Sequence, residues 1–357
     1  TDPLLRASGS AYDALGRMTA SLGNANAPVG AGDRAQILYV YDALDRLTRV
    51  TDPKGLHTDY AYNGFGERTR LSSPDTGVST YGYDAAGNQV TTTDARGVTK
   101  NVSYDALDRP TAVAYPSDGT QTIGFTYDTA SGDCAAGETY LTGRLARMTD
   151  ASGSTHWCYD RYGQLTRKVQ RTDGRAYALQ YLWTPPPPEP RRGYLIVPRP
   201  GSGKFHGWRY PDGTEVRLSE DREGRVRQLD VVMADGRRQR LLGGAHYRPF
   251  GPVSGWEYGN GLAHVRTFNA NYQPGVIQTG TLVNGDVVPN LTSLNLGYAF
   301  DAAGNLTALR DGAQADPPLR TYAYDGLDRL TAVRNGSNSQ LLQSYAYDAT
   351  GNRTGKS

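Results

Sequence analysis

The sequence predicts an all-β protein: a long, coiling antiparallel sheet built from repeated hairpins. Three observations lead to this prediction. A short phrase recurs along the chain, turn residues fall every 10 or 11 residues, and helical periodicity is absent. A single hairpin cannot bury its own apolar face, so each hairpin must stack on its neighbours. The expected product is an extended sheet rather than a compact sandwich.

The composition excludes several classes of protein. Among 357 residues, 38 Lys and Arg face 36 Asp and Glu, which gives a net charge of +2 and argues against a polybasic nucleic-acid binder. Tyr is abundant at 25, whereas Phe is scarce at six. No apolar run approaches the ~18 residues of a membrane span. We therefore expect neither nucleic acid nor a membrane span among the chain's partners.

The repeated phrase reads Tyr-Asp-x-x-Gly/Asp-Arg/Asn-Leu-Thr. Copies that begin at residues 41, 62, 83 and 104 are spaced 21 residues apart. The residues that we expect to act structurally in the copies are Tyr12, Asp13, Gly16, Tyr41, Asp42, Asp45, Tyr62, Gly66, Tyr83, Asp84, Gly87, Tyr104, Asp105, Asp108, Tyr127, Asp128, Tyr159, Asp160, Gly163, Asp301, Gly304, Tyr324, Asp325, Asp328, Tyr347, Asp348 and Gly351.

Each phrase contains a turn between two strands. Asp accepts hydrogen bonds from the backbone just after it, and the fourth turn residue, Gly16 or Asp45 for example, fits a left-handed conformation. A second turn, such as Asp52–Gly55, lies halfway through each repeat. Strands of six to seven residues, such as Arg46–Thr51 and Val98–Tyr104, connect these turns.

Tyr residues should form a ladder along the sheet. Strand alternation places Tyr322 and Tyr324 on one face and Ala323 on the other. Two interpretations stay open: cross-strand packing that stabilises the sheet, or an aromatic surface that binds sugars. Packing is favoured, because a Tyr that recurs with each hairpin is explained by the hairpin.

The sequence contains no recognisable catalytic, cofactor-binding or metal site. The five histidines, which are His57, His156, His206, His246 and His264, are far apart, and we expect ordinary surface or sheet residues. No Gly-x-Ser-x-Gly elbow occurs, and Gly355-Lys356-Ser357 lacks the earlier Gly of a phosphate loop. Nearly every Asp belongs to a turn. We therefore predict that the chain is not an enzyme and needs no cofactor.

Two further features interrupt the repeats. Cys134 lies in a stretched loop, and Cys158 directly precedes Tyr159 in a neighbouring repeat. They either form a disulfide, which suits an exported protein, or remain as two partly buried thiols. Residues 181–206 form a Pro-rich irregular insertion between repeat blocks 1–180 and 207–357. The four prolines at 185–188 cannot join a sheet interior, so they form a surface loop or a docking peptide.

The phrase resembles the YD-repeat of Rhs-type proteins over nearly the whole chain. Tyr210–Thr214, Tyr247–Pro252 and Trp256–Gly261 are also similar to segments of that family. The resemblance implies a spiralling sheet that closes into a hollow shell. In bacterial polymorphic toxins and insecticidal toxin complexes the shell encloses a toxic C-terminal domain, and in teneurins a related shell belongs to a cell-adhesion protein. Asp52–Leu56 has the letters of the family's cleavage signature but occupies an ordinary half-repeat turn, so no cleavage residue is carried over.

The resemblance therefore implies a structural segment of a shell that encapsulates the C-terminal toxic domain of a secreted bacterial toxin. The expected partners are that domain and the Rhs core of the same parent protein, with the secretion machinery and glycans as further candidates. The chain begins and ends in mid-repeat, so we expect a piece of a longer protein, secreted or on the cell surface, whose cut sheet edges self-associate. The alternative is a cell-surface adhesin or carbohydrate-binding module that uses Tyr-rich sheet faces.

Overall fold

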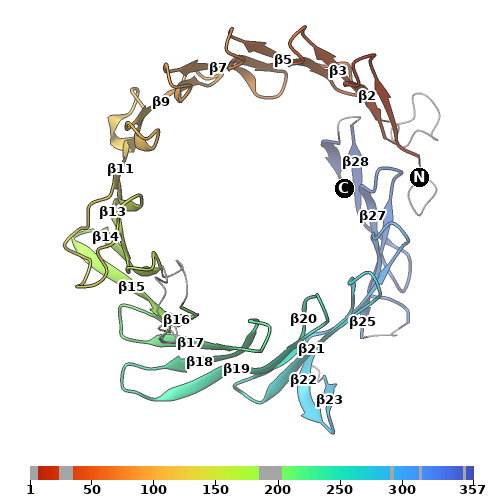
Figure 1. Cartoon of the computed structure of the whole chain (residues 1–357). Helices are drawn as coiled ribbons and strands as arrows, with labels where there is room; N and C mark the ends of the chain where they lie inside the picture. The colour runs from red at the N-terminus through yellow and green to blue at the C-terminus, as the bar shows by residue number, and fades with distance from the viewer. Residues whose placement is uncertain (1–6, 24–34, 185–202, 290–292, 313–315, 349–350) are drawn as a thin grey trace, which may run out of the picture. The chain divides into compact units, whose positions relative to one another are not determined.

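The computed structural model of the chain is all-β, as the sequence predicts. It describes residues 7–23, 35–184, 203–289, 293–312, 316–348 and 351–357. Within these residues lie 29 β-strands in one antiparallel sheet, no α-helix, and one 3-10 turn, η1 (Gly119–Gln121). The strands follow one another in chain order (Figure 1). In the described part of the chain, no helix is long and apolar enough to cross a membrane.

The chain divides into two compact units, the first of which comprises residues 1–79, 246–257 and 261–357. Its strands before residue 79 are β1 (Gly9–Tyr12), β2 (Met18–Leu22), β3 (Gln36–Tyr41), β4 (Leu47–Thr51), β5 (His57–Tyr62) and β6 (Arg68–Ser73). Its later strands are β21 (Leu262–Phe268), β22 (Pro274–Val283), β23 (Asp286–Val288), β24 (Asn295–Phe300), β25 (Leu306–Asp311), β26 (Arg320–Tyr324), β27 (Leu330–Asn335), β28 (Leu341–Tyr347) and β29 (Arg353–Lys356). β24 pairs with β22, so β23 is an extra strand beside the repeats.

The second unit comprises residues 80–245 and 258–260. Its strands are β8 (Gln89–Thr93), β9 (Thr99–Tyr104), β10 (Pro110–Ala114), β11 (Ile123–Tyr127), β12 (Leu145–Asp150), β13 (Gly153–Tyr159), β14 (Leu165–Thr172), β15 (Arg175–Trp183), β16 (Phe205–Arg209), β17 (Glu215–Glu220) and β18 (Val226–Val232). Strands β7 (Gly77–Tyr83), β19 (Arg238–Tyr247) and β20 (Val253–Tyr258) contain the unit boundaries. The division into repeat blocks 1–180 and 207–357 stays a prediction, and most of the Pro-rich insertion, residues 185–202, lies outside the described residues.

The repeat turns have the geometry that their residues predict. In the turn after β3, the Asp45 N–H donates to the Asp42 carbonyl and the Asp42 N–H donates to the Arg46 carbonyl. Asp45 adopts φ 61° and Gly16, at the same turn position, adopts φ 78°. The strand register shifts at Tyr41, which is how a type I turn followed by a left-handed residue makes a bulge.

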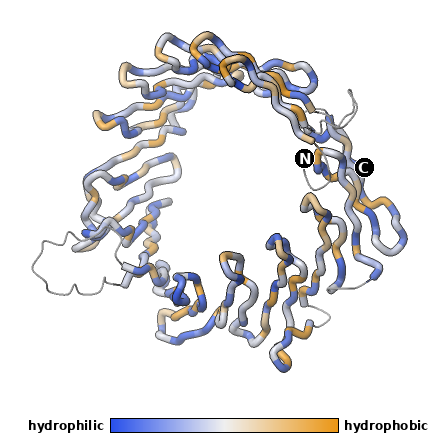
Figure 2. The backbone as a smooth tube through the Cα atoms, turned by 45° about the vertical axis from the view of Figure 1, so that its right-hand side comes forward, coloured by the Kyte–Doolittle hydropathy of each residue, from blue (hydrophilic) through white to orange (hydrophobic). Residues whose placement is uncertain are grey.

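The apolar interior is thin, because the sheet forms a single layer. Apolar and polar residues are interspersed along the strands (Figure 2), and most strand residues are only half-buried. Among the described residues, the large side chains that are fully buried are Leu141 and Cys158, and both belong to the stretched loop and the strand beside it. The sheet must therefore rely on side-chain links between successive hairpins as well as on its backbone ladder.

Candidate functional site

A repeated cluster of Asp, Arg and Tyr links each hairpin to the next, and we call it the repeat ladder. It begins with the turn Asp. Asp42 Oδ1 accepts the backbone N–H groups of Leu44 at 2.9 Å and of Arg46 at 3.0 Å. The same pair of bonds is made by Asp13, Asp84, Asp105, Asp160, Asp221 and Asp325, and by the amide oxygen of Asn63. A carboxylate at this position closes the turn by satisfying two backbone donors.

The second carboxylate oxygen binds the Arg that leaves the turn. Asp42 Oδ2 lies 2.7 Å from Arg46 Nε, and Asp13 pairs with Arg17 in the same way. Equivalent pairs join Asp105 to Arg109, Asp221 to Arg225 and Asp325 to Arg329. Hydrogen bonds from the backbone N–H and side chain of Arg46 hold the pKa of the Asp42 carboxyl below its ordinary value. The Asp42 carboxylate is therefore ionised at neutral pH.

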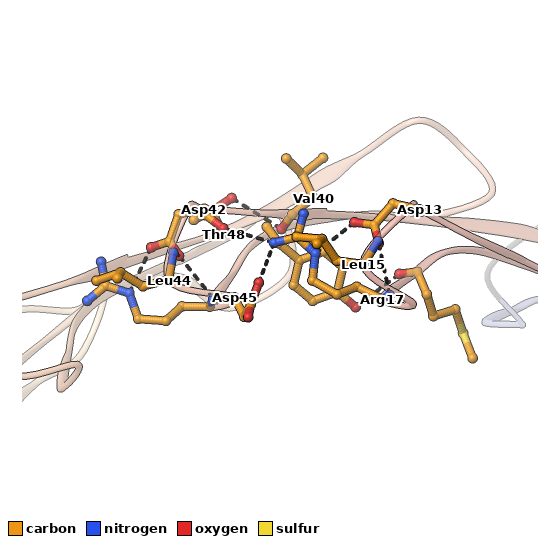
Figure 3. A network of polar contacts seen from close by, with 11 residues as sticks. Asp13, Leu15, Arg17, Val40, Asp42, Leu44, Asp45 and Thr48 are labelled. Atoms are coloured by element: carbon orange, nitrogen blue, oxygen red, sulfur yellow. Dashed lines mark hydrogen bonds and ion pairs between the residues drawn. The ribbon is translucent and has the colours of Figure 1, made fainter.

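The same Arg then reaches the next repeat. Arg17 Nη1 donates to the Asp42 carbonyl at 3.0 Å and pairs with Asp45 Oδ1 at 2.7 Å, so one guanidinium connects two turns (Figure 3). Arg46, Arg109 and Arg329 make corresponding bonds to Asn63, Asp128 and Asp348. Where Asn replaces Arg, its side-chain amide donates to an Asp carboxylate of the next repeat, from Asn88 to Asp108 and from Asn305 to Asp328. The fork of five donors on Arg suits this double contact.

The repeat Tyr completes the link. The guanidinium of Arg46 lies over the Tyr62 ring, 5.1 Å from its centroid, and the Tyr62 hydroxyl donates to the Leu47 carbonyl at 2.8 Å. The hydroxyls of Tyr41, Tyr104, Tyr127, Tyr324 and Tyr347 donate to the equivalent carbonyl of the preceding repeat. These contacts support the packing interpretation of the Tyr ladder, since each ring has a guanidinium over it or a bonded hydroxyl.

Several expected residues lie outside the regular ladder. Tyr12, on the first described strand, is 59% exposed. The turn that starts at Asp128 is stretched, and it closes when the Asp128 N–H donates to the Arg144 carbonyl at 3.1 Å. Arg144 then lies over the Tyr159 ring at 5.6 Å. Gly163 keeps the left-handed turn conformation, with φ 80°.

The sequence analysis missed two participants in the ladder. It treated the Arg after each turn as the start of a strand, although this residue makes the ion pair and the link to the next repeat. It also missed Trp183, whose indole Nε1 donates to the Leu165 carbonyl at 2.8 Å, as the Tyr hydroxyls do elsewhere. Two cues pointed to them: Arg recurs four residues after the turn Asp, and Trp183 ends a strand where Tyr is expected.

The stretched loop, residues 128–144, is attached to β13 by covalent and ionic contacts. Cys134 and Cys158 form a disulfide. Beyond it, the backbone of Glu138 accepts the Tyr159 N–H, and the Glu138 carboxylate pairs with Arg167 at 2.8 Å. Leu141, which belongs to the same loop, is buried. The loop therefore provides unit 2 with the small packed core that the single-layer sheet otherwise lacks.

The comparisons with known proteins agree with this repeat. The family model of the RHS repeat matches residues 41–78 and 69–99, which contain the copies that begin at residues 41, 62 and 83. The chain therefore contains RHS repeats over residues 41–99. No curated protein matches this RHS-repeat chain. No group of three or more potential metal ligands occurs in the described part of the RHS-repeat chain.

Solved Tc toxin structures have the same fold as this RHS-repeat chain. The TcdB2-TccC3-Cdc42 crystal structure matches 99% of the chain with a TM-score of 0.76 and 17% identity, and TcdB2-TccC3 matches 98% with a TM-score of 0.75 and 18% identity. A Tc holotoxin pore from Photorhabdus luminescens matches 98% with a TM-score of 0.73 and 17% identity. The RHS-repeat chain spans 19% of the length of the first two solved chains and 18% of the third. At this identity the likeness establishes the fold.

A single hydroxyl of the repeat ladder can be removed without changing the shape of its ring. We expect Tyr62→Phe to lower the free energy of unfolding by about 1 kcal/mol, because the hydrogen bond to the Leu47 carbonyl is lost. Chemical denaturation monitored by circular dichroism measures this change. The matched control is Tyr60→Phe on the same strand, because the Tyr60 hydroxyl has no hydrogen-bond partner among the described residues. Equal effects of the two substitutions would contradict the role given to Tyr62.

Proposed function

We propose that this chain is a structural segment of a β-sheet wall that encapsulates a toxic C-terminal domain of a longer, secreted bacterial protein. The observation that carries the proposal is the repeat ladder. It ties many successive repeats together through side chains, so the sheet can extend without a second layer. A wall of this kind acts by containment: it keeps the enclosed domain away from the cell that makes it until delivery.

Contacts inside unit 1 support the idea that such a wall closes on itself. Leu327, in a late repeat turn, lies against Gly23, and it lines a pocket of about 240 Å³ together with Ala35 and Ile37. Lys54, in a turn between β4 and β5, pairs with Asp348. The two partners in each of these contacts are separated by almost the whole chain. The contacts are not links between successive hairpins, so they do not belong to the repeat ladder.

Exposed apolar residues at equivalent turns support further stacking. Leu15, Leu44, Phe65 and Leu107 occupy the same place in their turns as Leu327, and Phe65 is 93% exposed. Single exposed apolar side chains are common, but a repeated row of them marks a surface for contact. In a longer wall, neighbouring windings of the sheet would cover these side chains as Gly23 and Ile37 cover Leu327.

The disulfide supports export. Disulfides persist in oxidising compartments, and the Cys134–Cys158 bridge closes a loop within a sheet that has little buried core. Export and the secreted or cell-surface location are parts of the same proposal. Its expected partners are the enclosed domain and the segment that follows the repeats in the parent protein.

The alternative function is an adhesin or carbohydrate-binding module. The repeat Tyr rings are engaged by Arg and by backbone carbonyls, which leaves them poorly placed as a sugar-binding face. An aromatic cluster in unit 2 is the better candidate, since the Phe205 ring contacts both Trp183 and Trp208, and Trp183 lines a pocket of about 470 Å³. Retention of the isolated chain on a glycan column would favour this alternative.

Electron microscopy of the intact parent protein, with mass spectrometry of its chains, tests the proposal. We expect a hollow particle that holds a C-terminal domain, and we expect that domain to resist protease until the particle is opened. A matched sample in which the C-terminal domain is deleted should show the same wall with an empty interior. An open sheet, or a C-terminal domain digested as fast as the free domain, would contradict encapsulation.

A further inference from the structure

A serine and a histidine lie side by side on β13, outside the repeat ladder. Ser154 and His156 are two residues apart on the strand, so their side chains share one face of the sheet. Ser154 Oγ lies 2.9 Å from His156 Nε2, within hydrogen-bond distance. Both residues are buried, with 9% and 6% of their surface exposed. A serine hydroxyl bonded to an imidazole nitrogen is the first half of a nucleophilic site.

The other imidazole nitrogen faces a carboxylate from the disulfide-bonded loop. Asp133 Oδ2 lies 3.1 Å from His156 Nδ1, and this buried nitrogen has no aligned hydrogen-bond partner. Catalytic hydrogen bonds are often poorly aligned before substrate binds. Asp133 is held from two sides, by the Arg171 guanidinium and by the disulfide of its neighbour Cys134. The order Ser154, His156, Asp133 is that of nucleophile, base and orienting acid.

The serine lines a pocket that two cations also line. This pocket has a volume of about 480 Å³, and its wall includes Ser154, the cations Arg147 and Arg171, and the carboxylates of Asp150 and Asp173. Arg147 on β12 pairs with His156 across the strands, and Arg171 on β14 pairs with Ser154. Gly153 keeps the backbone close here, because a Cβ would lie 1.9 Å from the Arg171 carbonyl oxygen. Arg171 is paired with Asp133, whereas Arg147 has no ion-pair partner among the described residues, so Arg147 can meet a negatively charged group of a substrate.

Burial favours the neutral form of the His156 imidazole. Burial lowers the pKa of His156, Asp133 opposes that shift, and Arg147 and Arg171 add to it. Hydrogen bonding to Arg171 holds the pKa of Asp133 below its ordinary value. At neutral pH the carboxylate is therefore ionised and attracts a proton on Nδ1, which leaves Nε2 free to accept the proton of Ser154.

We propose that Ser154, His156 and Asp133 form a serine-nucleophile site that hydrolyses esters of negatively charged acids. Ser154 Oγ forms a bond to the ester carbonyl carbon while its proton moves to His156 Nε2. The bond from that carbon to the alcohol oxygen then breaks, and His156 returns the proton to the leaving alcohol. A water molecule attacks the acyl-serine with His156 as base, which releases the acid and restores Ser154. Arg147 binds the acid's negative charge.

This site is independent of the proposed wall, because it needs only unit 2. A structural role offers the other explanation of the same contacts, since a buried polar cluster could simply fix the disulfide loop to β13. The two roles differ in the reactivity of Ser154. A structural serine stays inert toward an acylating or phosphonylating reagent, whereas an activated serine reacts with it and the imidazole controls the rate.

Labelling with a fluorophosphonate tests the nucleophile directly. We expect the full chain to take up one label, which peptide mass spectrometry should find on Ser154. Ser154→Ala should abolish the label, and His156→Gln should slow labelling by about 10²-fold or more. The matched control is Ser152→Ala, in the adjacent turn, which should label like the unsubstituted chain. An unlabelled Ser154 in a chain with its disulfide intact would overturn the proposal.

Ester hydrolysis tests the substrate class and the positioning residue. We expect a nitrophenyl hemisuccinate to be cleaved with a lower KM than nitrophenyl butyrate, and Arg147→Gln should raise KM for the hemisuccinate alone. Asp133→Asn should lower kcat at little cost in KM. The labelling rate should rise with pH through a pKa below 6.5 and stay level above it, because neutral His156 is the active form. A rate that is independent of pH would overturn the role of His156.

Discussion

Cys134→Ser should lower the free energy of unfolding of unit 2 by about 3 kcal/mol, which is the usual effect of a disulfide that closes a loop of this length. The bridge joins residues 24 apart and attaches loop 128–144 to β13. Cys158 is completely buried, and Leu141 of the loop is buried as well. Because the single-layer sheet has little other buried apolar surface, this loop contributes an unusually large part of the stability of its unit.

Thermal unfolding with and without a reductant measures this effect. The unsubstituted chain should lose stability when it is reduced, and Cys134→Ser should unfold at a low temperature that reductant does not change. The variant thus provides its own control for other effects of the reductant. Equal melting temperatures of the oxidised chain and the variant would show that the Glu138–Arg167 pair and the buried Leu141 hold the loop unaided.

Gly207→Ala should destabilise unit 2 by about 3 kcal/mol, at the upper end of the usual cost of a strained backbone. Gly207 lies in β16 between β15 and β17, and its φ is 151°. A Cβ at this position would lie 2.1 Å from the Val216 carbonyl oxygen. The clash is with backbone, so no side-chain rotation relieves it, and the ladder between β16 and β17 must open.

Denaturant unfolding of the two glycine variants provides the measurement. Gly64→Ala is the control, because no atom would lie within 4 Å of its Cβ. Its position in the repeat turn is also occupied by Ala43 in the preceding copy. We expect no loss of stability in the control, since Ala restricts the unfolded chain at no cost in the folded turn. A Gly207→Ala variant as stable as Gly64→Ala would contradict the close approach of β16 and β17.

Much of the local structure could be predicted from the phrase alone. The Asp-x-x-Gly turns, the left-handed residue at positions such as Asp45 and the strands on both sides depend on contacts within a few residues. The strand predicted at 98–104 is observed as Thr99–Tyr104, and the one predicted at 46–51 as Leu47–Thr51. Short-range hydrogen bonds decide such features, so the sequence carries the required information.

The side-chain links between repeats were harder to predict from the sequence. Arg17 reaches Asp45 over 28 residues, and the sequence shows only that both recur. The Ser154–His156–Asp133 cluster matches none of the motifs sought, and its Asp comes from a loop that departs from the repeat. In the sequence His156 is an ordinary strand residue. Only the folded, disulfide-bonded loop brings Asp133 next to it. For these reasons the sequence predicted no catalytic residues, although the structure contains a cluster with the geometry of a nucleophile, a base and an orienting acid.

The sequence by itself determined the hairpin repeat, its RHS type and the all-β class, because each depends on a phrase that is complete within 21 residues. Tertiary structure decided which side chains meet: Arg with the next turn, Tyr with the preceding carbonyl, and Asp133 with His156. The physical reason is that these contacts depend on strand register and on the direction of side chains from different hairpins. A repeat specifies its own turn, but its neighbours determine what that turn touches.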